Sequence, residues 1–446
     1  MSNARDIFLS ILEDNRNGVA KGIYSVCSAN SDVLEACFKQ AKSDGSVLLV
    51  ESTSNQVNQF GGYTGMKPAD FVGYVKSIAG KVGFPEEMIL LGGDHLGPNV
   101  WQNLPAREAM KKAESLIEEY VKEGYLKIHL DTSMFCADDR GDRTKPLEDE
   151  VVAMRTAMLC RVAEDAWVKY RKGYPKPIYI IGTEVPVPGG AHEFENKVVP
   201  TKPEDVVKTI AVIKGYFEKA GLSDAWKRVT GIVVQPGVEF GDDRVFYFQR
   251  ENAKGLSDEI MKSDHLVFEA HSTDYQTESD LKALVEGHFC ILKVGPWLTF
   301  AYREALFALE AMEIELMGEG HGGLSRLRET LENAMMNKPV YWEKYYSGNK
   351  RQQSFKRKYS FSDRSRYYWP MAELVLSRHR LFENLRKDCI PSSLLSQYMP
   401  IQFYQVSEGL IAADPQELVH SYIQIVTGIY SRACGLSQKI TAEKLK

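Results

Sequence analysis

The sequence has few cysteines and none of the close pairs that mark a disulfide framework. Its 446 residues include seven cysteines, an odd number, and no two of them form a CxxC pair. Small disulfide-stabilised proteins depend on paired cysteines at regular spacings. We therefore expect free thiols and a protein of the reducing cytoplasm. The seven residues are Cys27, Cys37, Cys136, Cys160, Cys290, Cys389 and Cys434.

Long apolar runs and an excess of basic charge are also missing. No apolar run approaches the roughly 20 residues of a membrane helix. Residues 1–18 carry acidic side chains and lack the apolar core of a signal peptide. The formal net charge is −5, which gives no overall basic field to hold nucleic acid or an anionic membrane. We expect a cytoplasmic protein with neither nucleic acid nor membrane as partner, whose ligands are small molecules or other proteins.

Short apolar runs alternate with amphipathic, helix-like segments over the first 300 residues. This alternation implies parallel strands that are covered by helices on both faces. Eight such units over roughly 280 residues are typical of a closed (β/α)8 barrel. A doubly wound open sheet is the competing arrangement. The predicted strands are residues 22–28, 46–52, 88–95, 126–133, 178–185, 231–237, 266–272 and 290–296.

Beyond about residue 300 the pattern is helical without strands. The sequence predicts a barrel over residues 1–335 and a helical C-terminal extension over residues 336–446, packed on the barrel or on a partner. A basic and aromatic segment, residues 341–370, lies within this extension. A solvated surface is its favoured interpretation, and a binding site for a sugar phosphate or an acidic partner is the alternative. Its basic residues include Lys350, Arg351, Lys356, Arg357, Lys358, Arg364 and Arg366.

Polar residues gather where the predicted strands end. In (β/α)8 barrels the functional groups lie at these carboxyl ends, which converge on the barrel axis. Two histidines and several carboxylates would therefore meet at one end of the barrel. The polar strand ends carry Glu51, Asp94, His95, Asp131, Ser133, Glu184, Gln235, Glu269, His271, Lys293 and Gly295.

A divalent cation needs imidazole or carboxylate ligands from separate elements and an open position for substrate. His95 and His271 are the best pair of ligands, with Glu184 as the third. Asp94 points away from His95 along the strand, but the following turn could bring its carboxylate to the substrate as an acid/base group. Hydrogen-bonded histidines at strand ends are the competing interpretation, and the two are about equally favoured.

Two further histidines have weaker claims to a function. His129 precedes Asp131 by two residues, so both share a face of their strand. A core histidine paired with a neighbouring carboxylate is the competing interpretation of His129. His192 lies in a glycine-rich loop after the fifth strand, where an exposed loop histidine is favoured over a contact to substrate or metal.

Phosphate groups bind to backbone N–H groups and small hydroxyls near helix N-termini, usually after the last two strands of a barrel. Ser272, Thr273 and Asp274 follow the seventh predicted strand, and Gly295 and Thr299 follow the eighth. Their position predicts a phosphate site there.

Several longer motifs carry a family resemblance. They are GGDHLGP, HLDTSMFCADD, IGTEVPVPGG, VVQPGVEF, FEAHSTDYQT, ILKVGPWLTFAYREALF, SDRSRYYWP and IPSSLLSQYMP. Together they resemble the Z-type subunit family of tagatose-bisphosphate aldolase, over nearly the whole chain. That family has also been labelled tagatose 6-phosphate kinase and includes hexose-phosphate 4-epimerases. The sequence has neither a GxxxxGK[ST] loop nor a protein-kinase signature set, so the kinase label is not supported.

The family is similar to metal-dependent class II aldolases, and this implies roles for individual residues. Asp94 and His95 match a pair in which Asp is the acid/base group and His a metal ligand. His271, Ser272 and Thr273 match a ligand histidine followed by phosphate-binding residues. Lys293 and the following valine match the last strand. Glu184 stands where those aldolases have a third histidine. The expected cofactor is a divalent metal, with zinc first and manganese, cobalt or nickel as alternatives.

The resemblance leaves three functions open. The leading hypothesis is a metal-dependent retro-aldol and aldol reaction that interconverts tagatose 6-phosphate and fructose 6-phosphate by inversion at C4, with Asp131 or Glu51 serving the opposite face. The second is a non-catalytic subunit that stabilises a separate aldolase subunit through the helical extension. The third is cleavage of tagatose 1,6-bisphosphate by the chain itself. An oligomer is expected in each case.

Overall fold

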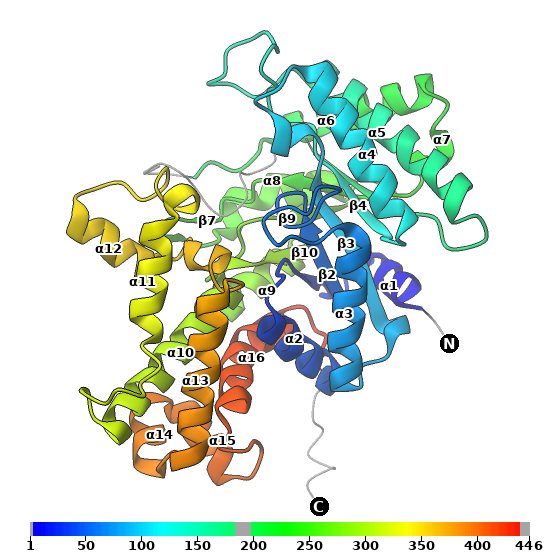
Figure 1. The fold of residues 1–446 in the computed structure, drawn as a ribbon. Coiled ribbons are helices and arrows are strands. Elements are labelled where there is room, and N and C mark those ends of the chain that lie inside the picture. Colours follow the sequence, from blue (N-terminus) through cyan, green and yellow to red (C-terminus); the bar gives the residue numbers. More distant parts are fainter. Residues whose placement is uncertain (1–2, 183–197, 438–446) are drawn as a thin grey trace, which may run out of the picture.

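The chain folds into a closed barrel of eight parallel strands with helices around it. The computed structural model describes residues 3–182 and 198–437 (Figure 1). Each barrel strand pairs with two neighbours in the order β1-β10-β9-β6-β5-β4-β3-β2, and β1 closes the ring by pairing with both β2 and β10. This confirms the predicted (β/α)8 class over the open sheet. The barrel strands are β1 Ile23–Val26, β2 Leu48–Thr53, β3 Ile89–Leu96, β4 Lys127–Leu130, β5 Ile178–Ile181, β6 Val229–Val234, β9 Val267–Ala270 and β10 Phe289–Val294.

The helices that follow the strands form the outer layer of the barrel. The first of them shows how the sequence sets their ends: the Asn30 side chain accepts N–H bonds at the start, and Gly45, at φ 65°, ends the helix in the left-handed conformation. These helices are α2 Ser31–Asp44, α3 Pro68–Val82, α4 Ala106–Lys122, α5 Asp149–Tyr170, α6 Pro203–Lys219, α8 Arg250–Ile260, α9 Glu278–Glu286 and α10 Pro296–Met317.

The interior of the barrel is apolar at the amino ends of the strands. Helix α1 (Ala4–Arg16) packs its apolar side chains, including Phe8 and Leu12, into a cluster with interior strand residues such as Ile23, Leu49 and Ile291. This packing leaves the carboxyl ends of the strands free for polar groups. Small elements that the sequence pattern did not predict are η1 Glu86–Met88, η2 Pro98–Trp101, α7 Ser223–Trp226 and the hairpin β7 Glu239–Phe240 with β8 Val245–Phe246.

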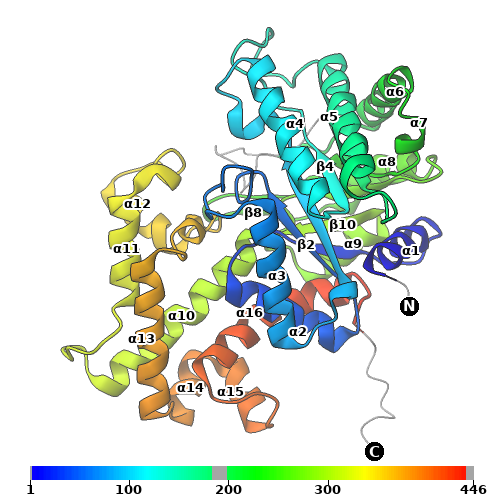
Figure 2. The same cartoon turned by 45° about the vertical axis from the view of Figure 1, so that its right-hand side comes forward.

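The C-terminal region is helical, as predicted, and lies on one side of the barrel (Figures 1 and 2). Its last helix, α16, returns to the barrel and packs against α2, α9 and α10. The Tyr430 hydroxyl donates to the Thr273 carbonyl oxygen at 2.8 Å, and Ser431 donates to Asp44. The domain boundary at residue 335 stays a prediction. The region contains α11 Leu327–Asn337, η3 Pro339–Tyr341, α12 Lys350–Tyr359, η4 Arg364–Tyr367, α13 Ala372–Asp388, α14 Ser392–Tyr398, α15 Pro400–Ser407 and α16 Pro415–Ala433.

Among the helices of the described ranges, none is both long and apolar enough to cross a bilayer.

Candidate functional site

Four buried, charged side chains form a layer across the barrel interior, above the apolar layer. Alternation along the strands turns Glu51, Lys127, Glu269 and Lys293 inward. Lys127 Nζ lies 2.5 Å from Glu51 Oε1 and 2.7 Å from Glu269 Oε2. Lys293 Nζ contacts the other oxygen of Glu51 and lies 3.1 Å from Asp94 Oδ2. Each buried charge therefore has opposite charges beside it, as a charged group in a barrel core requires.

Glycine at position 92 makes room for this layer. A Cβ atom at Gly92 would lie 2.8 Å from the Glu51 side chain, so a larger residue at this position would displace Glu51. The GGD sequence of β3 thus admits the Glu51 carboxylate into the barrel.

Three imidazole rings converge beside the charged layer. The ring centroids of His95 and His129 are 5.2 Å apart, those of His95 and His271 are 5.0 Å apart, and those of His129 and His271 are 5.4 Å apart. The three residues come from the ends of β3, β4 and β9. The structure therefore brings together the predicted pair, His95 and His271, and adds His129 to it.

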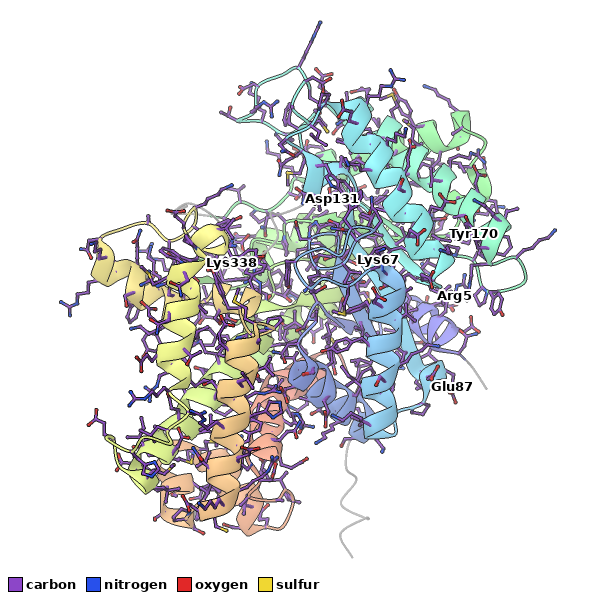
Figure 3. All side chains as sticks on the ribbon, in the orientation of Figure 1. Arg5, Lys67, Glu87, Asp131, Tyr170 and Lys338 are labelled. Atoms are coloured by element: carbon purple, nitrogen blue, oxygen red, sulfur yellow. The ribbon has the colours of Figure 1, made fainter. Side chains whose placement is uncertain are left out.

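His95 is held in place from two sides. Its backbone has a φ of 49°, in the left-handed region, which turns the residue out of the regular strand path. Its Nδ1 lies 2.8 Å from Asp131 Oδ2, and the other Asp131 oxygen accepts the Ser133 hydroxyl at 2.7 Å. Asp131, labelled in Figure 3, therefore orients His95, and Ser133 orients Asp131.

The donor atoms of four residues are arranged as a metal site requires. One ligand atom each from Asp94, His129, Glu269 and His271 lies within 4.8 Å of the others. His129 Nδ1 is 2.8 Å from Asp94 Oδ1, and His271 Nε2 is 3.0 Å from Glu269 Oε1. Within residues 3–182 and 198–437, His129 Nε2 is buried and has no hydrogen-bond partner. A buried imidazole nitrogen without a partner, close to carboxylates and other imidazoles, fits a ligand of a divalent cation.

The predicted ligand set and the observed cluster overlap in part. Glu184, the predicted third ligand, and His192 lie outside the described residues. His129, for which the sequence predicts no ligand role and leaves a core histidine as the competing interpretation, belongs to the observed cluster. The sequence feature that indicates a place for His129 in the site is its spacing. Lys127, His129 and Asp131 are two residues apart along one strand, so their side chains share its inner face.

A cavity of about 570 Å³ opens onto the cluster. Barrel loops and the C-terminal region both line it, including Cys27, Asn55 and Gln56 on the barrel side and Tyr341, Arg364 and Arg366 on the other. Of the predicted site residues, its wall contains Asp94, His95, His271, Ser272, Asp274, Lys293 and Gly295. The described part of the wall does not include the predicted residues Glu51, Asp131, Ser133, Gln235 and Thr273.

The residues predicted to bind phosphate hold their own loops together in this structure. Asp274 Oδ1 accepts the backbone N–H groups of Gly295 at 3.0 Å and Trp297 at 2.8 Å, and so caps the start of α10. Burial raises the pKa of Asp274 to about 6. The Thr273 hydroxyl donates to the Lys293 carbonyl oxygen at 2.6 Å. Gln235 Oε1 likewise accepts backbone N–H groups of its own loop, at 2.8 and 3.0 Å.

The pH dependence of stability should reveal the charge on His95. Burial alone lowers its pKa, but Asp94 and Asp131 outweigh burial and raise the pKa to about 9. The folded chain then holds a proton that the unfolded chain releases above pH 6.5, so stability falls as the pH rises. Burial lowers the pKa of Lys293 to about 8, which has the opposite effect above that pH. We expect metal-free protein to lose about 2 kcal/mol of unfolding free energy between pH 6.5 and 8.

Urea titrations at several pH values, in the presence of a chelator, measure this loss. His95→Gln should flatten the curve over the same window. An equal slope in the wild type and the variant would show that another group causes the change.

The barrel and the cluster of histidines and carboxylates together define the class of protein. It is a (β/α)8 barrel with buried histidines and carboxylates, which could hold a metal ion, at the carboxyl ends of its strands beside a cavity. The family model described as D-tagatose-1,6-bisphosphate aldolase subunit GatZ/KbaZ-like matches residues 8–435. The chain belongs to this family, as its sequence motifs indicated.

One solved structure agrees with the family assignment. A protein from Sinorhizobium meliloti 1021, named a probable tagatose 6 phosphate kinase, is 44% identical, with a TM-score of 0.84 over 93% of this chain and 100% of that one. The fructose-bisphosphate aldolase of Campylobacter jejuni is 15% identical, with a TM-score of 0.42 over 86% of this chain and 94% of that one. The YdjI aldolase of Escherichia coli K12 is 12% identical, with a TM-score of 0.37 over 85% and 96%. The last two likenesses are too low to support an inference about this chain.

Proposed function

We propose that this chain catalyses a metal-dependent retro-aldol and aldol reaction on a ketohexose phosphate and interconverts tagatose 6-phosphate and fructose 6-phosphate. The observation that carries the proposal is the buried cluster of three histidines and two carboxylates, of which Asp94, His95 and His271 line a cavity of about 570 Å³. Membership of an aldolase subunit family supports carbon–carbon bond chemistry on a sugar phosphate. Epimerisation at C4 follows if the bond that breaks is re-formed on the other face of the aldehyde.

His129 and His271, with Asp94 and Glu269, have donor atoms close enough together that they would hold the divalent cation. His95, whose ring centroid lies 5.0 Å from that of His271, and Glu184 are the further proposed ligands. Zinc suits a set of histidines and carboxylates. When bound, the cation supplies an electrophile for the C2 carbonyl oxygen. His129 contributes the buried Nε2 that has no other partner in the described structure. Asp131 and Glu269 fix the orientation of His95 and His271 by the hydrogen bonds given above.

Asp94 is placed to move the proton of the C4 hydroxyl. Burial alone raises its pKa, but His95 and His129 outweigh burial and hold the pKa well below its usual range, so the group is ionised. Its carboxylate lines the cavity and can accept the C4 hydroxyl proton. The C4–O bond then becomes a carbonyl, the C3–C4 bond breaks, and its electron pair forms the enediolate of the three-carbon fragment. Return of the electron pair and the proton after the aldehyde has turned gives the C4 epimer.

Lys293 belongs to the charged layer and also lines the cavity. Its ammonium group is 3.1 Å from Asp94 Oδ2 and lines the cavity wall. It can therefore stabilise negative charge on Asp94 or on a substrate oxygen. Glu51, which contacts both lysines, keeps them in place from below.

An assay of the purified chain tests the proposal. With zinc and tagatose 6-phosphate we expect fructose 6-phosphate as the product, and we expect a chelator to abolish its formation because the electrophile is lost. Added zinc should restore the activity. Elemental analysis of the protein before and after the chelator shows whether metal and activity disappear together.

Two other outcomes would replace the proposal. Triose phosphates from tagatose 1,6-bisphosphate would identify an aldolase. No turnover of either substrate, together with increased activity of a partner aldolase, would identify the supporting subunit that the family description suggests. Purified protein that contains no metal after incubation in zinc-containing buffer would also count against catalysis.

A further inference from the structure

Two arginines of the basic and aromatic segment face the cavity rather than solvent. Arg364 and Arg366 belong to η4, in the C-terminal region, and both line the cavity. Tyr341, Tyr345 and Tyr367 line it beside them. The C-terminal region thus supplies one wall of the cavity that the barrel cluster opens onto, and this wall is aromatic and positively charged.

Two of the basic neighbours of these arginines have carboxylate partners. Lys356 lies 2.7 Å from Asp242, and Arg357 contacts Glu332. Across the two described ranges, no carboxylate oxygen lies within 4.0 Å of a guanidinium nitrogen of Arg364 or Arg366. Arg364 is only 3% exposed, and its Nε is buried without a hydrogen-bond partner among the described residues. Burial lowers the pKa of this guanidinium.

Backbone and tyrosine oxygens hold the arginines in place without neutralising them. Arg364 Nη1 donates to the Tyr341 carbonyl oxygen at 3.2 Å. Arg366 donates to the Asp363 carbonyl oxygen and to the Tyr367 hydroxyl, both at 3.0 Å. The Asp363 carboxylate is occupied by the hydroxyls of Thr299 and Ser365. The positions of the guanidinium groups are therefore fixed, while their charges remain available.

The positive charge of the two arginines also affects the pKa of the neighbouring Tyr367. Burial alone raises the pKa of Tyr367, but Arg366 and Arg364 outweigh burial and lower the pKa below its usual value. Arg364 and Arg366 lie two residues apart, and among the described residues neither has a carboxylate oxygen within 4.0 Å, so an anion bound between them would offset the repulsion of their charges. The paired geometry of guanidinium donors matches the oxygens of a phosphate group.

The other candidate for an anion site is closed in this structure. The N–H groups of Gly295 and Trp297, at the start of α10, already donate to the Asp274 carboxylate. That carboxylate would also repel a phosphate placed against it. Among the described residues of the cavity wall, Arg364 and Arg366 are therefore the cations that have no carboxylate in direct contact.

We propose that Arg364 and Arg366 form the anion subsite of the cavity and bind the phosphate group of the sugar substrate, with its reacting carbons directed toward the histidine cluster. This inference rests on the proposed function for the identity of the sugar. It assigns the C-terminal region a direct role in substrate binding. It also predicts that the chain prefers phosphorylated sugars to the free sugars.

Calorimetric titration of chelator-treated full-length chain with inorganic phosphate, tagatose 6-phosphate and tagatose tests the subsite without requiring turnover. Arg364→Gln and Arg366→Gln should each weaken binding of phosphate and of tagatose 6-phosphate by about ten- to a hundredfold, because a charge-assisted bond is lost. Their effect on the binding of unphosphorylated tagatose should be small. Arg351→Gln, an exposed position of the same segment that is not part of the cavity wall, is the matched control and should bind like the wild type.

Unchanged affinities in both cavity variants, or a wild type that does not bind phosphate, would overturn the subsite. Circular dichroism and the melting temperature identify a variant that fails to fold, and Arg366, which is half-buried, provides a second variant if Arg364→Gln unfolds. Failure of the proposed function has a different result. If the wild-type chain binds tagatose 6-phosphate through these arginines but does not epimerise it, the proposed anion subsite stands and the proposed catalysis is wrong.

Discussion

Asp94→Asn is expected to lower kcat for the interconversion of tagatose 6-phosphate and fructose 6-phosphate by about a thousandfold, the typical contribution of a positioned general base. Asparagine has the same shape as aspartate but cannot accept the C4 hydroxyl proton. Asp94 also contacts His129 Nδ1 at 2.8 Å and Lys293 at 3.1 Å, so the substitution removes a charge from the cluster itself. Steady-state kinetics with zinc in the buffer measures the effect.

The metal content of Asp94→Asn distinguishes the two consequences of the substitution. A variant that keeps its zinc and loses its rate supports the proton-transfer role. A variant that loses both its zinc and its rate would indicate that the main role of Asp94 is to bind the metal. Asp142→Asn, an exposed aspartate in the loop after β4, is the matched control and should keep full activity. Wild-type kcat in Asp94→Asn would exclude Asp94 from the chemistry.

Lys127→Met is expected to lower the free energy of unfolding by about 3 to 5 kcal/mol, the usual cost of removing one partner of a buried ion pair. Lys127 Nζ lies between Glu51 and Glu269 at 2.5 and 2.7 Å, and all three side chains are 0% exposed. Methionine fills the volume of the lysine but leaves two carboxylates in the barrel core with less compensating charge. Urea denaturation at pH 7.5 measures the change.

A lysine at the surface provides the control for this substitution. Lys122 lies 3.4 Å from Glu119 with both side chains about 40% exposed, so Lys122→Met should change the unfolding free energy by less than about 1 kcal/mol. The double variant Lys127→Met with Glu51→Gln should recover part of the loss, because it removes one uncompensated charge. Equal losses for the two lysine variants would mean that water or a proton compensates the buried carboxylates.

The fold could be predicted from the sequence because each barrel strand has its own local signal. The apolar runs of β2 and β9, for example, are short and buried, and each lies between two helices. Parallel strands separated by helices leave few alternatives, and eight of them close a barrel. The contact of α16 with α2 could not be predicted, because it joins segments almost 400 residues apart and no local pattern encodes such packing.

The site could be predicted where function follows position along a strand. His95 and His271 lie at the ends of their strands and meet in the structure, as expected. His129 was harder to assign, because a histidine beside a carboxylate also occurs in ordinary cores. Arg364 and Arg366 could not be distinguished from a solvated basic surface, since only the three-dimensional packing shows which arginines have carboxylate partners.

The return of α16 to the barrel determines when the protein can finish folding during its synthesis. The hydrogen bond from Ser431 to Asp44 joins residues 387 positions apart, and Tyr430 contacts the loop that follows β9. A ribosome has therefore made all eight strands before the helix that covers α2, α9 and α10 emerges. Until then, apolar surface on those helices stays exposed to the solvent. The nascent barrel accordingly remains incomplete until α16 leaves the ribosome.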